Sequence, residues 1–171
     1  MKTLVIGLGN PALTDDGAGI YAAQAVRKAL PTEADVDVIE LSVGGLALME
    51  AMSGYRRVIL LDALWAPEDQ VGQVVQFDAG CLPATLNTAS THDVDLPTAL
   101  HVGRRLGVPL PLDEDIHIVA ITAHEVLTFG EKPTPPVNAA VPEAAARVLA
   151  LLGYTDVMIP EYAGGNIDDL P

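Results

Sequence analysis

Three side chains that lie far apart in the sequence, Asp16, Asp62 and His92, are the residues best suited to hold a metal ion. Two carboxylates and one imidazole form a donor set that suits divalent first-row metals, and the imidazole favours nickel, copper or zinc over magnesium or calcium. Three protein ligands would leave coordination positions open for water or for a group of a substrate. The sequence therefore predicts a site that acts on a bound molecule.

Each of these residues also has a purely structural interpretation. Asp15 or Asp16 could cap the helix that follows, because a carboxylate stabilises the free N–H groups at a helix N-terminus by roughly 0.5–2 kcal/mol. Asp62 could bond a turn after an apolar strand, and His92 could be an ordinary polar residue of a loop. A common position at one edge of a sheet would favour the functional interpretation for all three.

Strand and helix signals alternate along the chain, which predicts an α/β fold. We expect a three-layer arrangement, with a mostly parallel, five-stranded twisted sheet and helices on both faces, because parallel neighbours need crossover connections. The expected strands cover residues 3–6, 36–41, 57–61, 73–77 and 116–122, and the expected helices cover residues 16–30, 46–52, 96–106 and 142–152.

The three candidate ligands fall where such a sheet usually carries its functional groups, beyond the C-terminal ends of the strands. Asp16 lies at the head of the first expected helix, Asp62 at the end of the third expected strand, and His92 in the connection after the fourth. That connection, residues 78–95, and a second one, residues 123–141, are long enough to indicate functional or mobile loops.

Length and composition limit the class of protein. A chain of 171 residues fits one domain, expected over residues 1–153, followed by an acidic and flexible tail at 154–171. No apolar run approaches the roughly 20 residues that cross a bilayer, and no secretory signal is evident, so we expect a cytoplasmic monomer without membrane attachment. The net charge of -14 would repel nucleic acid, and it serves either solubility or the attraction of a basic partner.

A glycine loop offers an alternative function. The stretch from Gly7 to Ala12 fits the G-x-G-x-x-A pattern of dinucleotide-binding proteins, and Glu40 could bind a ribose. However, Pro11 removes one backbone donor, and Asp15 and Asp16 place negative charge where a pyrophosphate would lie. Binding of NAD or ATP is therefore the less favoured interpretation.

The remaining candidate residues carry weaker signals. Cys81 is the only cysteine, so the chain forms no internal disulfide and no thiolate cluster. His101 on an expected helix and His117 in an expected strand are best interpreted as structural. His124 and Glu125 follow the last expected strand and could contact a substrate or orient a ligand.

Three short motifs of the sequence, taken in order, resemble those of the hydrogenase maturation endopeptidases. They are Gly7-Leu8-Gly9-Asn10 running on to Thr14-Asp15-Asp16-Gly17-Ala18-Gly19, then Leu60-Leu61-Asp62-Ala63, then Ser90-Thr91-His92-Asp93. The resemblance implies that Asp16, Asp62 and His92 contact the metal and carry the catalysis. The word Glu40-Leu41-Ser42-Val43 departs from the family's Asp-Gly-Gly form.

The resemblance also implies a substrate, the precursor large subunit of a nickel-iron hydrogenase. The enzyme would recognise nickel that the substrate supplies, with other divalent metals able to substitute, and would remove the C-terminal extension. Hydrolysis would proceed by polarisation of the carbonyl or by activation of water. The rival interpretation is a checkpoint protein that binds a metal site in a partner without cutting it.

Overall fold

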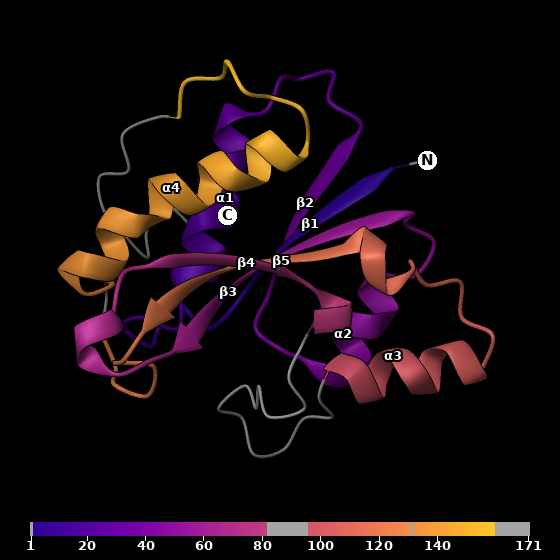
Figure 1. Ribbon diagram of the computed structural model, residues 1–171, viewed down its shortest axis with the longest axis horizontal. Helices are drawn as coiled ribbons and strands as arrows, with labels where there is room; N and C mark the ends of the chain where they lie inside the picture. Colours follow the sequence, from indigo (N-terminus) through magenta and orange to yellow (C-terminus); the bar gives the residue numbers. More distant parts are fainter. Residues whose placement is uncertain (1, 82–95, 131, 160–171) are drawn as a thin grey trace.

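The computed structural model describes residues 2–81, 96–130 and 132–159, and it shows a five-stranded sheet between helices (Figure 1). The strand order is β2-β1-β3-β5-β4. β4 runs antiparallel to β5, and every other neighbouring pair is parallel. The expected three-layer α/β fold with a mostly parallel sheet is therefore confirmed. The strands are β1 (Thr3–Leu8), β2 (Val36–Leu41), β3 (Arg57–Trp65), β4 (Val74–Asp78) and β5 (Ile116–Ala123).

Two helices cover each face of the sheet (Figure 1). α1 (Ala18–Ala29) and α4 (Pro135–Leu151) lie on one face, and α2 (Gly45–Ala51) and α3 (Leu96–Arg105) lie on the other. Three short 3-10 helices, η1 (Glu68–Gln70), η2 (Ala79–Cys81) and η3 (Asp113–Asp115), complete the described elements. None of the described helices is long and apolar enough to cross a membrane.

The core has two halves because successive side chains of a strand point to opposite faces. Ile59 and Leu61 of β3 pack against α1 and α4, whereas Val58 and Leu60 pack against α2 and α3. All four are buried, as expected for a central parallel strand that is covered on both sides.

The expected end of β3 is wrong. The strand continues from Leu61 to Trp65, and its pairing with β5 extends as far as Trp65 beside Ala123. Backbone hydrogen bonds maintain the strand across a polar residue, so Asp62 lies within β3, opposite Ala120, and not after it.

The expected start of the last helix is also wrong. α4 begins at Pro135, and Pro142 lies inside it. A proline fixes the φ angle that the first turn of a helix needs, so Pro135 and Pro136 can start the helix. Pro142 is tolerated within it, although it cannot donate a hydrogen bond to the carbonyl of Asn138. The other helices and strands begin and end within two residues of the expected bounds.

The chain after α4 returns to the core. Tyr154, Val157 and Ile159 pack against the cluster that α1 and α4 form with the sheet. These residues belong to the segment that we expected to be a tail, and residues 160–171 lie outside the described part of the chain.

Candidate functional site

Glycines bring the first turn of α1 and the loop before it close to β1 and β3. A Cβ atom at Gly19 would lie 2.3 Å from the carbonyl oxygen of Leu61 and 2.4 Å from that of Leu8, so only glycine lets α1 approach both strands this closely. Gly9 has a φ of 131°, and a Cβ atom there would lie 1.8 Å from the carbonyl oxygen of Asp16. The chain's own backbone therefore occupies the space beside Gly9 that a dinucleotide phosphate would need.

Asp16 is held in this loop by the residues that precede it. Its Oδ2 atom accepts a hydrogen bond of 2.7 Å from the backbone amide of Asn10. Burial raises the pKa of the Asp16 carboxyl, and the Asn10 hydrogen bond opposes that rise. Gly17 is the N-cap of α1 and no side chain caps this helix, so the capping interpretation of Asp15 and Asp16 is wrong.

Asp62 points to the same face of β3 as Leu60 and Leu64, which pack on the side of α2 and α3. Its Oδ1 atom accepts a hydrogen bond of 2.8 Å from the backbone amide of Ala63. Burial raises the pKa of the Asp62 carboxyl to about 7, the Ala63 hydrogen bond opposes this rise, and the charge of Asp16 adds to it. The structure thus brings Asp16 and Asp62 within electrostatic reach of each other.

No cation compensates this pair among the described residues. Neither Asp16 nor Asp62 forms an ion pair with a lysine, arginine or histidine that the structure describes. His92 lies outside the described residues, and within residues 2–81, 96–130 and 132–159 no three His, Cys, Asp or Glu side chains gather in a way that could hold a metal. The three-ligand set therefore stays a prediction, with two of its members placed together.

Asp15, for which we expected no role in joining segments of the chain, is fully buried and joins three of them. Its carboxylate accepts hydrogen bonds from the backbone amide of Thr134 at 2.7 Å and from the Thr134 hydroxyl at 3.1 Å. The backbone amide of Glu125 lies 3.4 Å from the same carboxylate. Asp15 thus fixes the Asp16 loop to the N-terminus of α4 and to the loop after β5. The only signal in the sequence was the adjacent pair of aspartates, which does not indicate which of the two is buried.

His124 lies at the same edge of the sheet, directly after β5. Its Nδ1 atom is 3.0 Å from the carbonyl oxygen of Ala66, and its ring lies 5.9 Å from the ring of Trp65. Its Nε2 atom is 3.9 Å from Oε1 of Glu68. The ring is therefore oriented by β3 and by the residues that follow it.

Other candidate residues have structural partners. Glu40 accepts hydrogen bonds from Arg27 at 2.7 Å and from Gln24 at 3.3 Å, which leaves the expected ribose contact without support. His117 Nδ1 lies 2.6 Å from Asp78 Oδ1 on the neighbouring strand, in agreement with a structural role.

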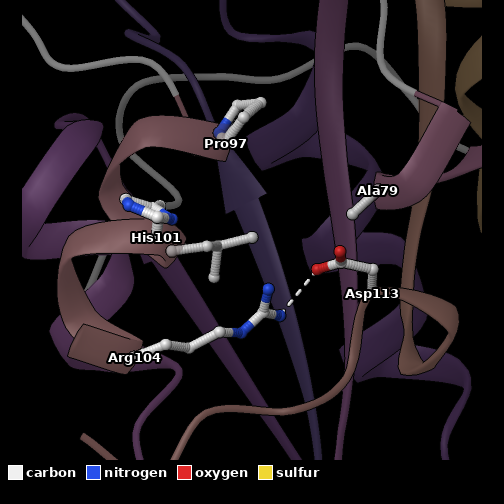
Figure 2. A pocket seen from close by; sticks show the side chains of 6 residues that line it. Ala79, Pro97, His101, Arg104 and Asp113 are labelled. Carbon is white, nitrogen blue, oxygen red and sulfur yellow. Dashed lines mark hydrogen bonds and ion pairs between the residues drawn. The ribbon is translucent and has the colours of Figure 1, made fainter. Parts of the chain in front are cut away.

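A cavity of about 230 Å³ lies between α3 and the residues next to β4 and β5 (Figure 2). Arg104 crosses it and donates a hydrogen bond of 2.6 Å to Asp113, which precedes β5. The cavity lies near the start of β5, whereas Asp62 pairs with Ala120 in the second half of β5. The cavity is therefore toward the opposite edge of the sheet from Asp62. It is lined by Ala79, Pro97, Leu100, His101, Arg104 and Asp113.

Known proteins resemble this chain along most of its length. It is 27% identical over 165 residues to the hydrogenase 2 maturation protease of Escherichia coli, covering 95% of this chain and 98% of that protein. It is 26% identical over 166 residues to the hydrogenase expression/formation protein HupD of Rhizobium leguminosarum, covering 95% of this chain and 81% of HupD. The structure of the hydrogenase maturating endopeptidase HybD from Escherichia coli superimposes with a TM-score of 0.73 at 26% identity, covering 99% of this chain and 100% of HybD.

The family model described as HycI, hydrogenase maturation protease, matches residues 20–151. This match includes β3 with Asp62, all of the sheet except β1, and most of α1. The fold and the order of its elements agree with the match. The chain therefore belongs to the hydrogenase maturation protease family.

Proposed function

We propose that this chain is the endopeptidase that removes the C-terminal extension from the precursor large subunit of a nickel-iron hydrogenase, and that it recognises nickel already bound to that precursor. Peptidase activity follows from family membership. The observation that carries the proposed recognition is that the charge of Asp16 acts on Asp62, and that neither carboxylate forms an ion pair with a described residue.

The chemistry of the pair fits a divalent cation. Burial is the main cause of the raised pKa of Asp62, and the negative charge of Asp16 adds to it. A cation bound by both carboxylates would offset both effects, because it would favour their ionised forms. Carboxylate oxygens alone suit many divalent metals, so the proposed third ligand, the imidazole of His92, supplies the preference for nickel. Other divalent metals could substitute because the donor set does not exclude them.

In this proposal Asp16, Asp62 and His92 bind the nickel of the precursor and thereby orient the nearby peptide bond. Hydrolysis adds water across that bond, releasing the extension and leaving a new carboxylate on the large subunit. The bound ion would polarise the carbonyl or lower the pKa of a water molecule, and both routes are open.

Selectivity follows from the same arrangement. A precursor without nickel would bring no ion to the acid pair, so it would gain little from binding at this site. A loaded precursor would gain coordination by three protein ligands, and the difference between the two affinities would delay cleavage until nickel is in place.

The experiment that tests the proposal mixes the purified chain with nickel-loaded precursor large subunits and follows the intact mass of each precursor. Loss of a C-terminal fragment supports the peptidase. A stable complex in which the precursor keeps its mass would instead support the checkpoint interpretation. Calorimetric titration with NAD and with ATP provides the control for the glycine loop, and we expect no binding of either.

We further propose that the chain acts in the cytoplasm as a monomer. This expectation rests on the sequence alone. Sedimentation of the purified protein measures the oligomeric state.

A further inference from the structure

The loop after β5 is attached to the loop that carries Asp16 by a ladder of backbone contacts. Thr14 donates a hydrogen bond of 2.8 Å to the carbonyl of Thr128, and Asp15 donates one of 3.2 Å to that of Glu125. Gly130 donates one of 3.2 Å to the carbonyl of Ala12, and Leu13 forms an isolated bridge with Phe129. Together with the hydrogen bonds of the Asp15 carboxylate, these contacts fix the backbone of the loop after β5 against residues 12–15.

Two large apolar side chains project from this fixed backbone into solvent. Leu127 is 73% exposed and Phe129 is 82% exposed. Trp65, at the end of β3, is 59% exposed and rests against His124, which begins the same loop. We call Trp65, Leu127 and Phe129 the rim patch. Large apolar side chains that are exposed to solvent on a well-ordered backbone are typical of a surface that binds another protein.

The loop that carries Leu127 and Phe129 is paired with the loop that carries Asp16. Leu13, which pairs with Phe129, lies three residues before Asp16, and Trp65 lies three residues after Asp62. In Figure 1 the ends of β3 and β5 point to the same side of the molecule. A polypeptide that reaches Asp16 can therefore extend over Leu127 and Phe129, which stand on the loop paired with the Asp16 loop.

The charges around the rim patch limit the kind of partner. The exposed charged residues nearest to the rim patch in the described sequence are Glu68, Asp69 and Glu125 against Lys132, so acidic side chains outnumber basic ones there. The whole chain has a net charge of -14. Such a surface complements an apolar segment that is flanked by lysine or arginine, and it disfavours an acidic segment.

We propose that the rim patch is the docking surface for the precursor large subunit, and that it takes an apolar segment of that subunit flanked by basic residues. The proposal rests on the function proposed above and adds to it a second point of contact, separate from the metal. The nickel-binding residues would select the loaded precursor, and the rim patch would add affinity that does not depend on the metal.

The test compares two double variants that remove equal apolar character from exposed positions. Leu127→Ser with Phe129→Ser removes two members of the rim patch. Leu106→Ser with Leu112→Ser is the matched control, because Leu106 and Leu112 are 75% and 61% exposed and lie beside α3 and η3, at the other edge of the sheet. Phe129→Tyr keeps an aromatic ring and serves as the conservative variant.

The measurements are the KM and kcat for cleavage of a nickel-loaded precursor and the Kd for that precursor immobilised on a sensor. We expect the rim double variant to raise KM and Kd by about tenfold or more, with kcat within about twofold of the wild type. The control and Phe129→Tyr should stay within about twofold of the wild type in all three values. Circular dichroism melts establish that both double variants are folded.

The outcomes separate the two proposals. Wild-type cleavage with unchanged KM and Kd in the rim double variant would overturn the docking surface and leave the proposed function intact. If the wild type binds the precursor without cutting it, the proposed function fails and the Kd ratio still decides the docking surface. If the wild type neither binds nor cuts any nickel-loaded precursor, both proposals fail.

Discussion

Asp16 and Asp62 come from different elements and share one electrostatic environment. Burial raises the pKa of Asp62 to about 7, the amide of Ala63 opposes that rise, and the negative charge of Asp16 adds to it. Asp16 is in the loop before α1, and Asp62 is the sixth of the nine residues of β3. Neither carboxylate forms an ion pair with a described residue, and the two are the members of the proposed metal site that the structure describes.

The first prediction concerns this coupling. Asp16→Asn should lower the pKa of Asp62, because it removes a negative charge while keeping an oxygen that can accept the Asn10 hydrogen bond. The pKa should remain above 3.8, since burial is the larger cause of its rise. Carbon-detected NMR titration of the metal-free protein measures it, with Asp69→Asn as an exposed acidic control. An Asp62 pKa that does not change in Asp16→Asn would show that the two carboxylates do not interact.

The second prediction is a dependence of stability on pH. The folded protein holds a proton on Asp62 up to about pH 7, whereas the unfolded chain releases it near pH 3.8. The raised pKa of Asp62 therefore does not change the free energy of unfolding below pH 3.8. It lowers that free energy progressively as the pH rises from 3.8 to about 7, and the reduction stays constant above about pH 7.

Asp62→Asn should remove this cost, because asparagine carries no charge and can still accept the hydrogen bond from Ala63. We expect the metal-free variant to be more stable than the wild type by about 2 kcal/mol at pH 8, with a smaller difference at pH 5. This value is smaller than the free energy that the whole pKa difference would give, because Asp62 is only partly buried and solvent screens its charge. Urea unfolding at both pH values measures the difference. A variant less stable than the wild type at pH 8 would contradict the raised pKa.

The third prediction concerns His92, which lies outside the described residues. His92→Ala should abolish processing of a nickel-loaded precursor and leave the melting temperature within about 2 °C of the wild type, because the sequence predicts that His92 lies outside the core. Activity and thermal unfolding of the same preparation measure both effects. Equal losses of stability and activity would instead indicate that His92 supports the fold.

The fourth prediction concerns the approach of α1 to the sheet. Gly19→Ala should destabilise the protein by roughly 1–3 kcal/mol, because its methyl group would collide with the carbonyl oxygens of Leu8 and Leu61. Gly80→Ala is the matched control, since a Cβ atom there would meet its nearest neighbour, Asp113 Cβ, at an ordinary 3.8 Å. Equal unfolding free energies for the two variants would show that α1 has room to move.

Much of the fold could be predicted from the sequence, and the exceptions have physical causes. Apolar runs indicated the five strands, because both faces of a parallel sheet are buried. The same criterion ended β3 at Leu61, since a carboxylate interrupts an apolar run, whereas the backbone pairing with β5 continues to Trp65. Pro142 suggested a helix start, although α4 begins at Pro135.

The candidate site was predictable only in part. Asp16 and Asp62 could be expected at one edge of the sheet, because α1 and β3 both meet that edge. The different fates of Asp15 and Asp16 could not be expected, since adjacent aspartates carry no local signal of which one turns inward toward Thr134. The rim patch was equally hidden, because the exposure of Leu127 and Phe129 depends on a loop fixed by distant residues.

The rate of cleavage of nickel-loaded precursor, relative to nickel-free precursor, tests the central claim most directly. Intact-mass analysis over time gives both rates, for the wild type and for Asp16→Asn. The account predicts that the wild type cleaves the loaded form at least about a hundredfold faster than the nickel-free form, because the nickel-free form lacks the ion that the site recognises. The Asp16→Asn variant should cleave little of either form. Equal wild-type rates for loaded and nickel-free precursor would contradict it.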